Sequence, residues 1–138
     1  MPENARDLDA SRLTDAELVA VERAMHAVVS RDADRIRPML DASRHHNPED
    51  FWMWANDYGD QGPLTLVVPP GSPSSWNIWG VRTKEGGLAL DLDVWASTGG
   101  TDLTLSLTLH HDADGTPRVQ LDDLHVLGQR RFPALRRA

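Results

Sequence analysis

The chain has 138 residues, 40% of them hydrophobic, which is the size and composition of one compact domain with a single core. It has no cysteine, which excludes thiol catalysis, disulfides and thiolate metal sites. The formal net charge of −7 argues against nucleic acid or an anionic membrane as a partner, because phosphate binding needs clustered cations. No apolar leader and no bilayer-spanning apolar run occur, so we expect a soluble, cytoplasmic protein.

The N-terminal part carries helical signals. Residues 1–13 show no periodicity and are expected to form a flexible leader. Thr14 and Glu17 have the spacing of a capping box, which predicts a helix that begins at Asp15. Apolar residues then recur on one helical face as far as Val29. This stripe predicts a helix that buries one side.

Two further helices follow in the sequence. Asp32 is a suitable N-cap for a short helix, which Pro38 should end or kink. Asn47 and an N1 proline then predict an aromatic helix over residues 48–58, with Gly59 as its C-terminal cap.

From Leu64 onward the hydrophobic period changes from helical to alternating, and turn residues separate the segments. In the last segment the alternation slips by one residue, which predicts a β-bulge near Asp122 and Asp123. The predicted strands cover residues 64–68, 76–83, 88–96, 103–110 and 119–126.

These elements predict an α+β fold in which about three helices pack on one face of a curved antiparallel sheet of four to five strands. The single domain would span residues 14–128, with leucines facing the helices and a polar, wet face opposite. Solvent, a second copy and a ligand all stay open as what meets that face. Residues 129–138 form a basic tail, interpreted as a solvated terminus or, alternatively, a contact for an anionic or protein partner.

The motifs Thr101–Leu105 (TDLTL) and Asp122–Leu127 (DDLHVL) resemble the C-terminal signature of an uncharacterised family of small bacterial proteins. The order of helices before a curved sheet is also similar to the NTF2-like (SnoaL-like) superfamily, which contains isomerase-like and cyclase-like enzymes, binders and dimerisation modules. That resemblance implies a pocket between the helices and the concave sheet face, with a carboxylate or a His-Asp pair inside it in the enzymes. The leucines on the likely concave face here depart from this pattern.

Two groups of side chains are candidates for acid-base chemistry. Asp91 and Asp93 lie on the polar face beside a strand of threonine, serine and histidine, and are interpreted either as proton-transfer groups or as a solvated face. Asp122, Asp123 and His125 lie at the predicted bulge, where a side chain can be redirected into a site. His125 fits equally well as a packed, hydrogen-bonded histidine.

No metal site or cofactor is predicted. The adjacent pairs His45-His46 and His110-His111 should point apart, unlike the i, i+4 histidines that converge on one ion. Glycine-rich phosphate loops and a nucleophile elbow do not occur in the sequence.

Tryptophan is enriched, with five residues against two phenylalanines and one tyrosine. Such residues line ligand pockets or anchor partners, although core packing is the commoner reason for them. A loop over residues 71–75 adjoins them. The candidate ligand- or partner-binding residues are Trp52, Trp54, Trp76, Trp79, Asp91, Asp93 and Trp95.

Two functions follow as hypotheses. The first is a binding module that recognises a protein partner, or its own copy as a homodimer, through the polar sheet face and the tryptophan-bearing loop. The second is an NTF2-like pocket enzyme or binder that acts on an apolar small molecule with Asp122, Asp123 or His125. An enzyme of this kind needs an enclosed cavity of roughly 300 Å³ or more around those groups. A binding module needs a surface with apolar anchors and a polar rim.

Overall fold

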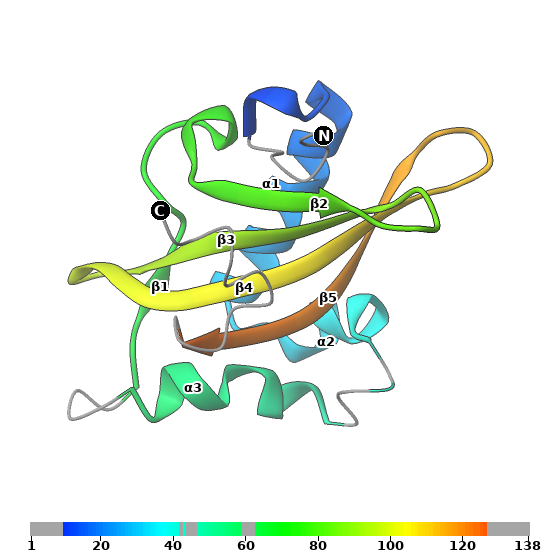
Figure 1. Cartoon of the computed structure of the whole chain (residues 1–138). Helices are drawn as coiled ribbons and strands as arrows, with labels where there is room; N and C mark the ends of the chain where they lie inside the picture. Colours follow the sequence, from blue (N-terminus) through cyan, green and yellow to red (C-terminus); the bar gives the residue numbers. More distant parts are fainter. Residues whose placement is uncertain (1–9, 42, 44–46, 59–62, 127–138) are drawn as a thin grey trace.

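The computed structural model describes residues 10–41, 43, 47–58 and 63–126, and here most helical segments precede an antiparallel sheet (Figure 1). The predicted α+β class is confirmed. Most of the predicted leader and all of the basic tail fall outside the described residues. Within these ranges, no helix combines the length and apolarity needed to cross a membrane. The helical segments are η1 Ala10–Arg12, α1 Asp15–Val29, α2 Ala33–Ile36, η2 Arg37–Met39, η3 Pro48–Trp52, α3 Met53–Asn56 and η5 Pro73–Ser75.

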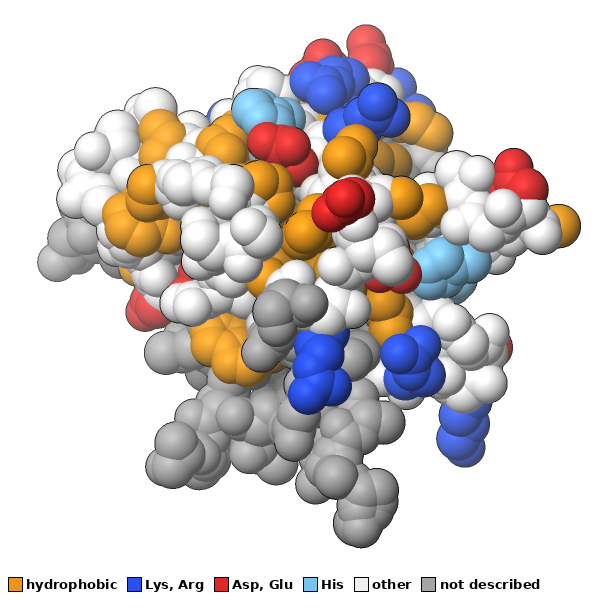
Figure 2. All heavy atoms as spheres, turned by 90° about the horizontal axis from the view of Figure 1, so that it is seen from above, with side chains coloured by type: hydrophobic (Ala, Val, Ile, Leu, Met, Phe, Trp, Pro, Cys, Tyr) orange, Lys and Arg blue, Asp and Glu red, His pale blue; other side chains and the backbone are white. Residues whose placement is uncertain are grey.

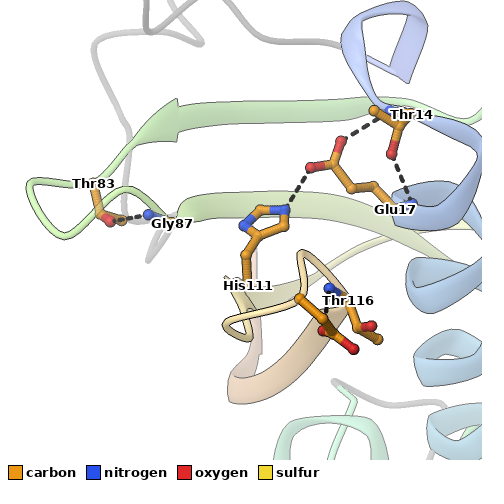
Figure 3. Close-up of polar contacts among 7 residues, drawn as sticks. Thr14, Glu17, Thr83, Gly87, His111 and Thr116 are labelled. Carbon is orange, nitrogen blue, oxygen red and sulfur yellow. Dashed lines mark hydrogen bonds and ion pairs between the residues drawn. The ribbon is translucent and has the colours of Figure 1, made fainter.

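Helix α1 begins at the predicted residue, and its capping box is complete. The Glu17 amide donates to Thr14 Oγ1 at 3.1 Å, and the Thr14 amide donates to Glu17 Oε1 at 2.8 Å. The other carboxylate oxygen of Glu17 pairs with His111 Nε2 at 2.8 Å, so a strand end anchors the start of the helix (Figure 3). Val21, Met25 and Val28 are fully buried, which confirms the predicted apolar stripe.

Burial alone would raise the pKa of Glu17. The hydrogen bond from the Thr14 amide, together with the hydrogen bond and charge of His111, outweighs it and holds this pKa below its ordinary value.

The predicted helix over residues 48–58 is shorter and divided. A 3-10 helix, η3, covers its first turn, and the single α-helical turn of α3 ends at Asn56. Asn47 caps it as predicted, by accepting from the Glu49 amide at 3.2 Å. Phe51 and Trp52 are buried, and Trp52 Nε1 donates to the Val28 carbonyl at 2.9 Å. We attribute the division of this helix to the packing of Trp52 against the end of α1, because tertiary packing contributes more to helix stability than the helix propensity of the residues does.

The sheet has five strands in the described chain, in the order β1-β3-β4-β5, with β2 also paired to β3. Because β4 pairs along one edge of β3, strands β1 and β2 share the other edge, and the loop carrying η5 connects them. The first two strands are shorter than predicted and the fourth is longer, whereas the third has its predicted bounds. The strands are β1 Leu66–Val67, β2 Ile78–Arg82, β3 Leu88–Ala96, β4 Gly99–His111 and β5 Pro117–Val126.

The register contains two irregularities. Ser106 pairs with Asp123 while Leu107 pairs with Leu121, so Asp122 is the extra residue, and the predicted bulge is confirmed. A second shift between β3 and β4, beside Val94, has no sequence signal. There the Thr101 hydroxyl donates to the Val94 carbonyl at 2.7 Å.

The leucine faces of β3, β4 and β5 form the core with α1, as predicted. Figure 1 shows α1 on one side of the sheet. The fully buried leucines of this layer are Leu90, Leu92, Leu103, Leu105, Leu107, Leu109, Leu121 and Leu124.

Candidate functional site

The sheet face opposite the leucines is polar, as predicted. The sequence also predicts that this face is exposed to solvent, but its centre is buried. Asp91, Thr104 and Ser106 are 0% exposed, His125 is 1% exposed and Asp122 is 3% exposed. Burying such groups is costly unless they are hydrogen-bonded to one another, and single-sequence periodicity cannot show those bonds.

A serine joins the carboxylate and the histidine of this face. Ser106 Oγ donates to Asp91 Oδ1 at 2.6 Å and lies 3.0 Å from His125 Nε2. Ser106 lies between the carboxylate and the imidazole, whose Nδ1 lies 3.1 Å from the Val126 carbonyl oxygen. The order is therefore Asp-Ser-His, whereas a nucleophilic triad places histidine between the acid and the serine. In such a triad the histidine links the serine to the carboxylate, and here it does not.

Asp122 belongs to a second group on the same face. Its carboxylate accepts from the Thr108 hydroxyl and from Gln120 Nε2, each at 2.7 Å. Asp123 instead accepts from the backbone amide of Leu124 at 2.9 Å. The predicted set Asp122, Asp123 and His125 is thus divided among different partners.

The histidine pairs behave in part as expected. His110 Nε2 lies 3.1 Å from Gln120 Oε1, while His111 reaches Glu17 in the helical layer, so the two side chains point apart. His45 and His46 lie outside the described residues.

A cleft of about 140 Å³ opens between the β1–β2 connection and the end of β3. Asp93 Oδ2 accepts from Asn77 Nδ2 at 3.0 Å, and Trp76 Nε1 donates to the Gly71 carbonyl at 3.4 Å. Trp76 is buried and Trp95 is half-buried. The cleft is lined by Pro69, Pro70, Ser75, Trp76, Asn77, Asp93 and Trp95.

Local sequence explains why the chain forms a wall here. Pro69 and Pro70 cannot donate to a strand ladder, so pairing stops after β1. Gly71 then turns the chain at φ +84°, a conformation that favours glycine. The turn leads into η5 and on to β2, which returns to the same edge of β3.

The surface around this end of the molecule is mixed. Figure 2 looks from the side on which α1 begins and η5 lies, and shows hydrophobic side chains at the surface among charged ones of both signs.

Only some of the candidate tryptophans reach the cleft. Trp76 and Trp95 line the cleft, and Trp79 on β2 is half-buried opposite Asp91 in the register. Trp52 and Trp54 belong to the helical side, where Trp52 is 3% exposed and Trp54 packs partly against the core. The latter pair is therefore not brought to the cleft.

Sequence reasoning missed the cleft residues Pro69, Pro70 and Asn77. The available signal is a Pro-Pro-Gly turn between two short strands, next to a tryptophan. It points to a loop but not to the strand that the loop covers.

The chain matches no curated protein and no solved structure. A family model matches residues 25–127, which make up most of the chain and contain the cleft. The chain therefore belongs to the family described as "Domain of unknown function (DUF7668)".

Proposed function

We propose that this chain is a binding module that takes one side chain of a protein partner into the cleft between the β1–β2 loop and β3. The observation that carries the proposal is the size of the cleft, about 140 Å³, together with its indole, proline and carboxylate lining. Pockets for whole small molecules measure roughly 300–1,000 Å³, so a single side chain fits better. Tryptophans beside a polar rim are also typical anchors of protein interfaces.

The buried polar face supports the same function. Its hydrogen bonds tie β3, β4 and β5 together through Ser106 and Thr108. Side chains held by such bonds keep fixed positions, and a binding site built on a rigid sheet loses less entropy when a partner binds.

The NTF2-like enzyme remains the second candidate. In that superfamily the pocket lies between the helices and the concave sheet, and here fully buried leucines occupy that layer. Asp122 and His125 are buried on the other face, as an acid-base pair would be, but each is engaged by its own partners. The binding module therefore ranks first. We also propose that the protein is located in the cytoplasm and comes from a bacterium.

Site-specific cross-linking tests the proposed function. We would place a photo-cross-linking amino acid at Ser74, which is exposed beside the cleft, or at Glu85 in the distant β2–β3 hairpin turn. In cells that express the chain natively, adducts should form from position 74 and not from position 85. The captured partner is then identified by mass spectrometry, and its affinity for the purified chain is measured.

Two matched tryptophan variants make this test specific. Trp95→Ala removes a cleft wall, while Trp54→Ala removes an indole that is also half-buried but lies on the helical side. We expect only Trp95→Ala to weaken binding of the captured partner, by ~10-fold or more, as for an interface anchor. Equal adducts at both positions, or equal affinities for both variants, would refute it. If the captured protein is a second copy of the chain, the cleft serves a homodimer and not a separate partner.

A further inference from the structure

We propose that the side chain taken into the cleft is cationic, an arginine or a lysine of the partner. This inference rests on the proposed function and names its ligand class. The observation behind it is that the carboxylate of Asp93 and the indoles of Trp76 and Trp95 line the same cleft.

The carboxylate is half-buried and oriented. Asp93 extends from β3, and Asn77 Nδ2 donates to its Oδ2 at 3.0 Å. The backbone also ties these residues, since the Asp93 amide donates to the Asn77 carbonyl at 3.4 Å. A negative charge held at a partly dry wall attracts a cation more strongly than one in bulk water. Charge-assisted hydrogen bonds from guanidinium or ammonium groups are correspondingly strong.

The remaining walls suit the rest of such a side chain. Indole faces attract cations, and a guanidinium plane stacks on them. Pro69 and Pro70 add apolar wall for the methylene stem. A side chain that is apolar along its stem and positive at its tip therefore matches the whole lining, because the stem can pack on the apolar walls and the tip can donate to the carboxylate.

The charge of the chain favours a basic partner over a second copy. Each copy carries a formal net charge of −7, so two copies repel each other over long range. A basic segment of another protein is attracted by the same field.

The test titrates the intact protein with N-acetylarginine methylamide and follows the indole N–H resonances of Trp76 and Trp95 by NMR. The matched probe is N-acetylcitrulline methylamide, which keeps the shape and removes the charge. We expect saturable shifts with the arginine probe at millimolar concentration, as befits a single side chain, and affinity at least ~10-fold weaker for the citrulline probe.

Two variants with the same change in charge locate the effect. Asp93→Asn neutralises the cleft, and Asp114→Asn neutralises a fully exposed turn residue. Only Asp93→Asn should weaken arginine binding, by ~10-fold. Equal affinities for the two probes, or for the two variants, would overturn the cationic ligand. If cross-linking still finds a Trp95-dependent partner in that case, the binding module stands and only its ligand class falls.

The same titration identifies a competing occupant. The competitor variant carries glutamine in place of Arg130, Arg131, Arg136 and Arg137 in the full-length chain and keeps all seven cleft residues named above. An unaltered affinity supports a partner's side chain. A tenfold gain in affinity would show that the chain's own arginines compete for the cleft, and would overturn the assignment to a partner.

Discussion

Replacing Ser106 by alanine should destabilise the protein far more than the loss of one oxygen atom implies. The hydroxyl donates to Asp91 Oδ1 at 2.6 Å and lies 3.0 Å from His125 Nε2, and all three side chains are at most 1% exposed. Without it, a buried carboxylate and a buried imidazole each lose one hydrogen bond. An incompletely satisfied buried group costs ~1–3 kcal/mol, so we expect a loss of ~2–6 kcal/mol for the pair.

Urea unfolding followed by far-UV circular dichroism measures this loss. With a slope of ~2 kcal/mol/M, in the middle of the range for a small domain, the midpoint should fall by ~1–3 M while the slope stays unchanged. Ser97→Ala, at an exposed position of the β3–β4 turn, is the matched control and should change stability by less than ~0.5 kcal/mol. If Ser106→Ala unfolds within 0.5 kcal/mol of the wild type, the buried Asp-Ser-His connection contributes nothing, and the account of the polar face is wrong.

Two further predictions concern Glu17 and Gly87, which are both drawn in Figure 3. The lowered pKa of Glu17 means that its stabilising contribution is complete above the ordinary carboxyl value of 4.5 and is lost as the pH falls below it. The free energy of unfolding should therefore drop more steeply on acidification for the wild type than for Glu17→Gln, and parallel curves would contradict the pairing with His111. Gly87→Ala places a Cβ atom 2.7 Å from the Leu109 carbonyl oxygen, whereas Gly100→Ala meets nothing within 4 Å. The thermal midpoint should fall for Gly87→Ala by several degrees, ~1–3 kcal/mol, and hardly move for Gly100→Ala; equal midpoints would refute the close approach.

The elements that could be predicted are those whose signals are local. The capping box at Thr14 places the start of α1, and strict alternation after a glycine turn places both ends of β3. The phase slip locates the bulge at Asp122 because a bulge changes which face each later side chain takes.

The elements that could not be predicted depend on partners distant in the sequence. The helix over residues 48–58 is divided where Trp52 reaches the end of α1. The polar face tolerates burial because Ser106 bonds both Asp91 and His125 across three strands, and a single sequence does not reveal that register.

The candidate site was predictable only in pieces. Asp93, Trp76 and Trp95 are recognisable as candidates from residue type, but nothing local separates them from Trp52 and Trp54. The cleft exists because β1 and β2 both return to one edge of β3, so the intervening prolines face Asp93 and Trp95. Edge sharing of this kind is a property of the sheet topology and has no counterpart in hydrophobic periodicity.

A crystal structure of the chain with the partner segment identified by cross-linking would show whether the cleft holds a cationic side chain. We expect a side chain of the partner inside the cleft, between the indoles of Trp76 and Trp95, with its cationic tip within ~3 Å of the Asp93 carboxylate. A partner seated on another surface, with no side chain in the cleft, would contradict this expectation.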